Sequence, residues 1–222
     1  MICTPIMAES TDIAIVKMAK AHALADVIEI RLDLMEEFDL KKIIRSATRP
    51  ILVTHRSRKE GGNEAVSYET TVRCLTEAIT EGADYVDVEL NLPLEYRKAI
   101  VERKGICRVI VSAHLLNRTP SSNALKALFN KMADTGGDIV KIVTWAKTWE
   151  DNFRVLELIP LAQSRGIEII ALCMGPLGRV SRILSPLMGG YLTFAALEYG
   201  EESAPGQISA SNMRKIWNIL SP

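Results

Sequence analysis

Eight short apolar segments alternate with amphipathic segments along the whole chain, and this alternation is the strongest constraint on its fold. The apolar segments are predicted strands at residues 2–7, 27–32, 51–54, 85–90, 108–113, 139–144, 168–173 and 191–195. The amphipathic segments are predicted helices at residues 12–23, 40–45, 71–80, 94–103, 123–132, 150–164, 180–187 and 211–220. Strict alternation of this kind is typical of parallel strands joined by helical crossovers.

Eight strand–helix units in 222 residues match the size and count of an α/β fold, the (β/α)8 TIM barrel. The alternative is an open, doubly wound sheet. Neither a G-x-G-x-x-G nor a G-x-x-x-x-G-K-[ST] segment follows the first predicted strand, which counts against that alternative. No linker-like or low-complexity segment divides the chain. We therefore expect residues 1–222 to form a single barrel domain.

Charge, hydropathy and cysteine spacing argue against a nucleic-acid-binding, a membrane-spanning and a disulfide-containing protein. The 27 basic and 27 acidic residues cancel, so no basic surplus indicates a nucleic-acid partner. No apolar run approaches the ~18 residues that a membrane span needs, and the N-terminus lacks the features of a signal peptide. The four cysteines are far apart, which argues against zinc sites and disulfides. We expect a cytoplasmic protein without membrane association.

Polar residues recur at alternate positions of the predicted strands. Side chains two apart point to the same face of a strand, and in a barrel one face points into the lumen. The helix-facing positions are apolar, so the polar sets should point inward near the carboxyl ends, where barrel active sites lie. We expect these side chains to converge there: Glu29, Arg31, Arg56, Asp87, Glu89, Ser112, His114 and Lys141.

Lys141 has β-branched, apolar neighbours on the sixth predicted strand. Burial disfavours an ammonium and lowers a lysine pKa by as much as ~3–5 units. A partly neutral lysine can attack a carbonyl and form a Schiff base. A buried lysine that pairs with a carboxylate for structural reasons is an equal alternative. The whole polar set could likewise be an ion network that fills the lumen of a binding protein.

His114 lies one strand before Lys141 and can shuttle protons near neutral pH. His22 is expected at a helix surface, and His55 should face away from the lumen because its parity is opposite to that of Arg56. Arginines suit a substrate carboxylate in geometry and charge. Glu60, in the loop after the third strand, either orients His114 or is solvated, and its spacing favours the second interpretation.

Two later loops carry further polar or glycine-rich segments. Residues 174–182 follow the seventh strand, and their glycines form either an anion cradle or a tight turn. Residues 203–207, Ser-Ala-Pro-Gly-Gln, follow the eighth strand and form either a polar lid or an ordinary loop. Neither loop has the run of glycine amides expected of a phosphate site.

Taken together, these segments resemble the type I 3-dehydroquinate dehydratase family over nearly the whole chain and in the same order. Seven segments carry the resemblance: Glu29-Ile30-Arg31-Leu32-Asp33, Arg56 with Glu60-Gly61-Gly62, Asp87-Val88-Glu89, Ser112-Ala113-His114, Asp138-Ile139-Val140-Lys141, Ser181-Arg182 and Ser203-Ala204-Pro205-Gly206-Gln207. Each segment is weak alone, whereas seven in register are highly specific.

The resemblance implies a lyase that converts 3-dehydroquinate into 3-dehydroshikimate in the shikimate pathway through a lysine Schiff base. In the family's scheme Lys141 forms the imine, His114 transfers protons and Glu60 pairs with His114. Arg182 binds the substrate carboxylate. The substrate's hydroxyls are bound by Glu29, Arg56, Ser203 and Gln207. Arg31 supports the layer that these polar side chains form. The resemblance implies a homodimer and neither a metal nor an added cofactor.

The chain departs from the family pattern after the seventh strand. Leu172 and Met174 stand where members often carry a methionine pair, and Gly175-Pro176-Leu177 replaces a Lys-Glu segment. These changes affect the apolar floor and the shape of the loop. The alternative enzyme is another Schiff-base barrel, such as a class I aldolase, although those that act on sugar phosphates need a phosphate cradle.

Overall fold

Eight parallel strands form a nearly closed barrel in the computed structural model, which describes residues 1–63 and 67–220. The strands are β1 (Ile2–Ile6), β2 (Val27–Arg31), β3 (Ile51–Thr54), β4 (Tyr85–Glu89), β5 (Arg108–Leu115), β6 (Ile139–Trp145), β7 (Glu168–Met174) and β8 (Thr193–Phe194). They are hydrogen-bonded in the order β7-β6-β5-β4-β3-β2-β1-β8. Between β7 and the segment before β8, the Tyr191 N–H donates to the Ile169 carbonyl at 2.8 Å. The barrel prediction is confirmed.

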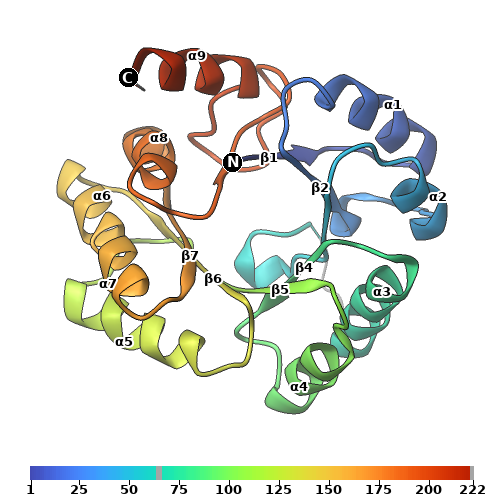
Figure 1. Ribbon diagram of the computed structural model, residues 1–222, viewed down its shortest axis with the longest axis horizontal. Helices are drawn as coiled ribbons and strands as arrows, with labels where there is room; N and C mark the ends of the chain where they lie inside the picture. The colour runs from blue at the N-terminus through green and yellow to red at the C-terminus, as the bar shows by residue number, and fades with distance from the viewer. Residues whose placement is uncertain (64–66, 221–222) are drawn as a thin grey trace.

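A ring of helices surrounds the strands (Figure 1). The helices are α1 (Thr11–Ala21), α2 (Leu40–Arg45), α3 (Tyr68–Glu81), α4 (Leu94–Arg103), α5 (Ser122–Ala133), α6 (Trp149–Leu156), α7 (Leu158–Ser164), α8 (Arg179–Leu187) and α9 (Ala210–Leu220). Short 3-10 turns follow three strands: η1 (Leu32–Leu34), η2 (Arg58–Glu60) and η3 (Pro176–Gly178). The described helices contain no segment long and apolar enough to cross a bilayer.

The prediction of one helix at residues 150–164 is wrong, because the structure has two helices that meet at Glu157. Pro160 explains the break. Proline has no N–H to donate and its ring clashes with the carbonyl four residues earlier, so it is tolerated only in the first turn of a helix. Pro160 occupies that turn of α7. The start of α6 is as predicted, since Asp151 accepts the Thr148 N–H at 3.0 Å in a capping box.

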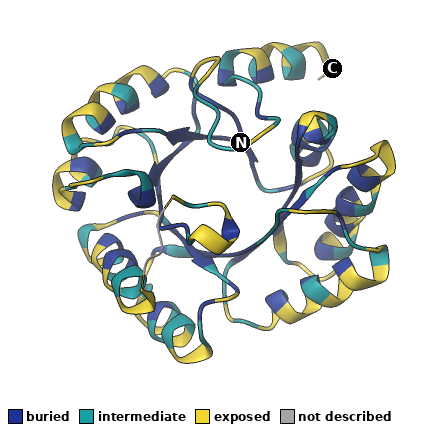
Figure 2. Ribbon diagram, turned by 180° about the vertical axis from the view of Figure 1, so that it is seen from behind, coloured by how far each residue is buried: buried dark blue, intermediate teal, exposed yellow. Residues whose placement is uncertain are grey.

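The core has two parts that follow from strand parity. Outward-facing strand residues pack under the helices, and Figure 2 shows this burial on the inner sides of the helices, with the exposed residues outside. Inward-facing residues form an apolar layer inside the barrel: Cys3, Val27, Leu52, Ile110, Ile139, Ile170, Leu172, Leu192 and Phe194. The next inward positions toward the carboxyl ends carry the polar residues, so this apolar layer is the floor of the site.

Candidate active site

A cavity at the carboxyl end of the barrel collects the predicted site residues. It is lined by all nine of them: Glu29, Arg31, Arg56, Glu60, His114, Lys141, Arg182, Ser203 and Gln207. They come from four strands or the loops after them, from helix α8 and from the loop after β8. Of the side chains expected to converge, five therefore line this cavity: Glu29, Arg31, Arg56, His114 and Lys141.

Lys141 is buried in the cavity, with 4% of its surface exposed. Its Nζ lies 2.9 Å from Asp87 Oδ2 and 4.2 Å from the centre of the Phe194 ring. The structural alternative was thus right that Lys141 has a carboxylate partner. Strand β5 lies between the two residues, and its Ser112 donates a hydrogen bond to Asp87 Oδ1 at 2.6 Å.

Arg56 joins the acidic residues of neighbouring strands. Its Nη2 lies 2.7 Å from Asp87 Oδ2, and its Nη1 lies 3.2 Å from Glu89 Oε1 and donates to Ser112 Oγ at 2.9 Å. Burial opposes the ionisation of Asp87. The charges of Arg56 and Lys141 outweigh it and hold the pKa of Asp87 well below its usual range.

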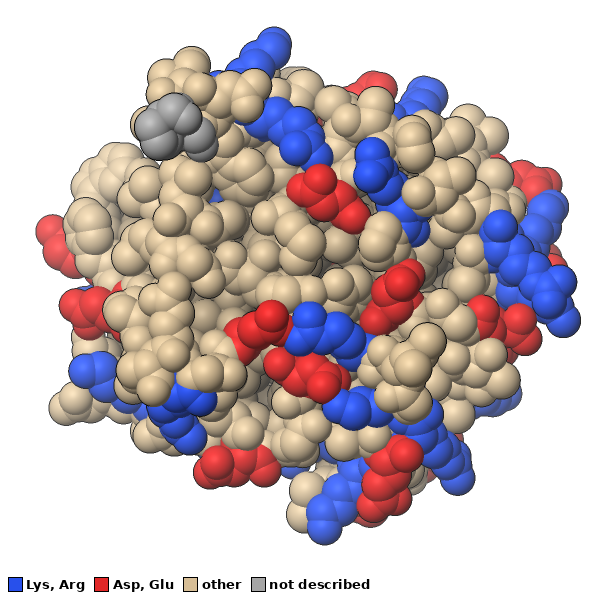
Figure 3. Space-filling view, in the orientation of Figure 1, with Lys and Arg blue, Asp and Glu red and all other residues tan. Residues whose placement is uncertain are grey.

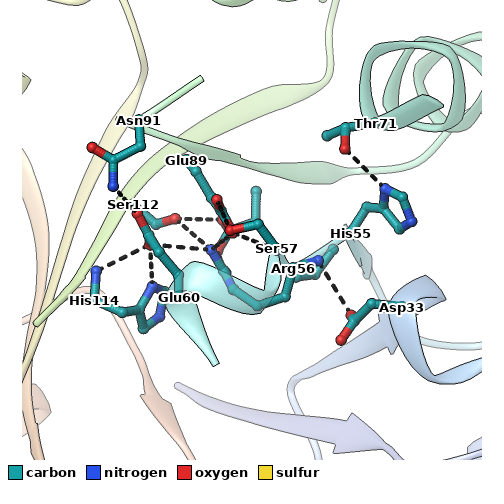
Figure 4. Close-up of polar contacts among 12 residues, drawn as sticks. Asp33, His55, Arg56, Ser57, Glu60, Thr71, Glu89, Asn91, Ser112 and His114 are labelled. Carbon is teal, nitrogen blue, oxygen red and sulfur yellow. Dashed lines mark hydrogen bonds and ion pairs between the residues drawn. The ribbon is translucent and has the colours of Figure 1, made fainter. Parts of the chain in front are cut away.

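Glu89 joins the converging set through Arg56 but, like Asp87 and Ser112, does not line the cavity itself. It is the last residue of β4, where the loop after β3 covers it. The Ser57 N–H donates to Glu89 Oε1 at 2.8 Å and the Ser57 hydroxyl donates to Oε2 at 2.6 Å. These bonds hold the carboxylate behind Arg56, as Figure 4 shows.

Glu60 pairs with His114, so the solvated alternative for Glu60 is wrong. Its Oε2 lies 2.8 Å from His114 Nδ1 and accepts the His114 backbone N–H at 3.1 Å (Figure 4). Burial is the largest cause that raises the pKa of Glu60 to about 7, and repulsion from Glu89 is the second. Burial is also the largest cause that lowers the pKa of His114 well below its ordinary value, and the charges of Arg56 and Lys141 act in the same direction.

The loop after β3 brings Glu60 to this position. His55 points outward, with Nδ1 3.1 Å from Thr71 Oγ1 on α3, while Arg56 points inward, as parity predicted. The 3-10 turn η2 then ends at Gly61, whose φ of 91° is left-handed. A Cβ on Gly62 would lie 2.0 Å from the Arg56 carbonyl oxygen. Only glycine fits so close an approach, so Gly62 lets the loop fold back over the cavity.

Arg182, on α8, is the fully buried cation of the site and has few partners. Its Nη2 donates to the Pro205 carbonyl at 3.4 Å, and its Nε has no partner. No acidic side chain among residues 1–63 and 67–220 forms an ion pair with it. Burial lowers its pKa to about 10, so it remains cationic at neutral pH. A buried, unpaired cation is costly, and an anionic ligand would compensate it.

The two loops near Arg182 pack against each other. Ser203 and Gln207 form mutual hydrogen bonds, from Ser203 N–H to Gln207 Oε1 at 2.9 Å and from Gln207 Nε2 to Ser203 Oγ at 3.0 Å. The Gly175 N–H donates to the Pro205 carbonyl and the Gly178 N–H to the Gly175 carbonyl, each at 3.0 Å. These two amides are thus used within the protein, and the loop after β7 is a tight turn rather than an anion cradle.

The two polar residues of β2 have fixed partners. Glu29 Oε1 accepts the Thr54 hydroxyl at 2.7 Å. Arg31 binds Asp33 through two bonds of 2.8 and 2.7 Å, which anchors its guanidinium beside the cavity.

Sequence reasoning missed most of the apolar wall of the cavity and expected only Leu172 and Met174 there. The wall is formed by Leu116, Val143, Trp145, Leu172, Met174 and Phe194. Parity was a usable signal for Val143 and Trp145, which continue the alternation of Lys141 along β6. It also missed Asn91, whose Nδ2 donates to Glu60 Oε1 at 2.8 Å.

Among the described residues, the surface charges seen in Figure 3 and the cysteines form no comparable arrangement. On the face seen in Figure 3, acidic and basic side chains are interspersed. The four cysteines are buried and unpaired by disulfides. Within the described part of the chain, no three His, Cys, Asp or Glu residues form a group that could hold a metal ion.

The comparisons with known proteins identify the same family over nearly the whole of this chain. The family model described as type I 3-dehydroquinase matches residues 2–222. A Methanocaldococcus jannaschii 3-dehydroquinate dehydratase is 33% identical over 99% of both chains. The bifunctional 3-dehydroquinate dehydratase/shikimate dehydrogenase of Arabidopsis thaliana is 41% identical over 99% of this chain, which spans 37% of that protein.

A solved structure gives the same result. A type I 3-dehydroquinate dehydratase from Clostridium difficile with covalent modified comenic acid has a TM-score of 0.88 and 28% identity, and the match covers 99% of this chain and 91% of that one. Because the family model and relatives above 30% identity cover nearly all of the sequence, the chain belongs to the type I 3-dehydroquinase family.

Proposed function

We propose that this chain dehydrates 3-dehydroquinate to 3-dehydroshikimate through an imine between Lys141 and the C3 ketone of the substrate. One observation carries the proposal. Lys141, His114 and Arg182 all line one cavity, and Arg182 has no acidic partner among the described residues. The cavity thereby offers an amine nucleophile, a proton carrier and a binding site for a carboxylate. The names of the relatives in the family agree with this activity.

The reaction begins when the neutral amine of Lys141 adds to the ketone and one water leaves, which forms the imine. The protonated imine is an electron sink, so the proton at C2 becomes acidic. His114 removes this proton, and the C1 hydroxyl then departs as water with a proton from His114. Water hydrolyses the imine and regenerates Lys141. The net change is the loss of one water and the formation of one C=C bond.

Asp87 and Glu60 prepare the two reacting groups. Lys141 Nζ lies 2.9 Å from Asp87 Oδ2 in the resting site, so the amine must leave this contact before it attacks the ketone. Ionised Glu60 accepts the Nδ1–H of His114, which leaves Nε2 as the basic nitrogen. The pKa of His114 is low, so the imidazole is neutral at physiological pH, as a general base must be.

The remaining residues bind the substrate in this scheme. Arg182 has guanidinium donors free for the substrate carboxylate, and Pro205 is its neighbour in the loop that covers the site. Glu29, Ser203 and Gln207 line the cavity with oxygen and amide groups suited to hydroxyls. Arg56 binds Asp87, Glu89 and Ser112, so it acts as much by holding these groups as by contacting a hydroxyl.

Turnover by matched lysine variants tests the proposal. The product contains a conjugated enone that absorbs in the ultraviolet, whereas the substrate does not. Lys141→Met should abolish formation of this product. Lys147→Met changes an exposed lysine six residues later and should leave turnover unchanged. Turnover that survives in Lys141→Met would exclude the imine mechanism. A different Schiff-base barrel, such as an aldolase, would give no enone with either variant or with the unmodified protein.

We also propose that residues 1–222 act as one domain, as a homodimer and in the cytoplasm, because the resemblance to the family implies these properties. Light scattering during size-exclusion chromatography tests the dimer. The expected mass is twice that of the 24.6 kDa chain, and a mass equal to one chain would contradict it.

A further inference from the structure

Asn91 lies beside the proposed catalytic pair but none of the roles above involves it. It follows β4 in a turn that is closed by the Leu92 N–H, which donates to the Glu89 carbonyl at 3.0 Å. The residue is exposed to solvent, yet its side chain points inward, and its Nδ2 donates to Glu60 Oε1 at 2.8 Å (Figure 4).

This contact occupies the second oxygen of Glu60. Its Oε2 already accepts the backbone N–H of His114 and faces Nδ1 of the same residue. Donors on both oxygens favour the ionised carboxylate. A carboxylate at Oε2 in turn requires a proton on His114 Nδ1, so Nε2 keeps its lone pair.

The surrounding charges leave this state finely balanced. Glu60 is faced by Glu89 and Asp87, which disfavour its charge, and by Arg56, whose Nη1 lies 3.7 Å from Oε2 and favours it. The charges that face His114 are Arg56, Lys141, Asp87 and Arg31. Burial and Glu89 raise the pKa of Glu60 to about 7, so the loss of the Asn91 hydrogen bond would shift its charge in the neutral pH range.

We propose that Asn91 is a positioning residue that holds Glu60 as a carboxylate and thereby keeps Nε2 of His114 free to accept a proton. The importance of this for turnover rests on the proposed function of His114. Without Asn91, the Nδ1 proton of His114 passes to Glu60 Oε2 and a solvent proton binds Nε2, so protonated Glu60 now donates a hydrogen bond to Nδ1. The imidazole then carries its proton on Nε2, which can no longer act as the base.

The tautomer of His114 can be observed directly, without substrate. The chain has three histidines, so ¹⁵N-histidine NMR spectra are simple to assign with His22→Gln and His114→Gln. We expect the Nδ1–H form in the unmodified protein above about pH 7. The midpoint pH of the change to the Nε2–H form should rise by about one unit in Asn91→Ala. It should rise further in Asn91→Asp, which adds a negative charge beside Glu60.

Asn123→Asp is the matched control, because Asn123 is an exposed asparagine on α5, away from the site. Its transition should match that of the unmodified protein. If the tautomer of His114 changes at the same pH in the Asn91 variants as in the unmodified protein, the inference is overturned. Asn91 is exposed and in a turn, so its variants should fold, and their thermal unfolding is the check.

The kinetic profile provides the second readout. The acid limb of kcat/KM should move to higher pH in the Asn91 variants, while the rates converge with those of the unmodified protein at alkaline pH. A loss that is equal at every pH would indicate a merely structural role and contradict the inference. If no imine forms on Lys141, the proposed function fails. If the imine forms while the His114 transition stays fixed, only the role of Asn91 fails.

Discussion

Lys141 Nζ and Asp87 Oδ2 lie 2.9 Å apart although their strands, β6 and β4, are separated by β5. The stagger of a barrel makes this possible, since inward-facing residues of alternate strands form common layers. The same carboxylate also binds Arg56 at 2.7 Å. Asp87 is therefore the shared counter-ion of two buried cations.

Replacement of Asp87 by asparagine should strongly destabilise the fold. It leaves Lys141 and Arg56 without their common carboxylate, and breaking a buried ion pair in this way costs about 3–5 kcal/mol. Urea unfolding measures the change. Asp12→Asn breaks the exposed Lys42–Asp12 pair instead and should have no measurable effect. Equal stability of the two variants would show that Asp87 has no special role.

Replacement of Glu60 by glutamine should stabilise the protein at alkaline pH. Folded Glu60 keeps its proton up to about pH 7, whereas the unfolded residue loses it near 4.5. Folding therefore takes up a proton in this interval, and stability falls as the pH rises through it. Glu60→Gln removes this loss, which is at most about 3 kcal/mol at pH 8 and near zero at pH 4.5.

Urea unfolding between pH 4.5 and 8 measures the effect of Glu60→Gln. The exposed Glu95 on α4 supplies the control, and Glu95→Gln should reproduce the profile of the unmodified protein. A Glu60→Gln profile parallel to the unmodified one would mean that Glu60 has no raised pKa. The same variant should be slow in turnover, because glutamine cannot provide the negative charge that orients His114.

His114→Ala should lower kcat by about 10²–10⁴-fold, the usual contribution of a general acid–base group. Steady-state kinetics with 3-dehydroquinate measures it. His22 is the appropriate control, because it lies at the exposed end of α1, where its Nδ1 is 2.7 Å from Thr48 Oγ1. His22→Ala should retain full activity, and a His114→Ala enzyme of similar activity would remove His114 from the mechanism.

Arg182→Met should weaken substrate binding without loss of stability. Removal of the partner of a substrate carboxylate should raise KM on the order of 10²-fold. Since Arg182 is a buried cation without an acidic partner in the described part of the chain, its loss should leave thermal unfolding unchanged or shift it upward. Arg179→Met, an exposed change on the same helix, should alter neither quantity. An unchanged KM in Arg182→Met would place the carboxylate elsewhere.

Strand parity accounts for most of what the sequence could predict. The period of two in β2, β4, β5 and β6 placed Glu29, His114 and Lys141 in the lumen, because a strand fixes which face each residue takes. The break between α6 and α7 was also readable, since Pro160 cannot lie in a helix interior. Local rules are sufficient for such features.

Contacts between distant strands and loops were not predictable in this way. The Asp87–Lys141 pair depends on the stagger of three strands, and the Glu60–His114 pair depends on the turn that Gly61 and Gly62 allow after η2. Glu89 points to the face that the parity of β4 predicts, but its carboxylate accepts hydrogen bonds from Ser57, in the loop after β3. Each result depends on tertiary geometry, which one strand's pattern does not contain.

The most direct test of the account is reductive trapping on Lys141. The protein is incubated with 3-dehydroquinate and borohydride, digested with trypsin and mapped by mass spectrometry. Trypsin does not cleave after a modified lysine, so an adduct on Lys141 should appear on the uncleaved peptide 132–147. The account predicts this adduct, and predicts its absence from Lys141→Met. Absence of any adduct, or an adduct on another lysine, would contradict the central claim.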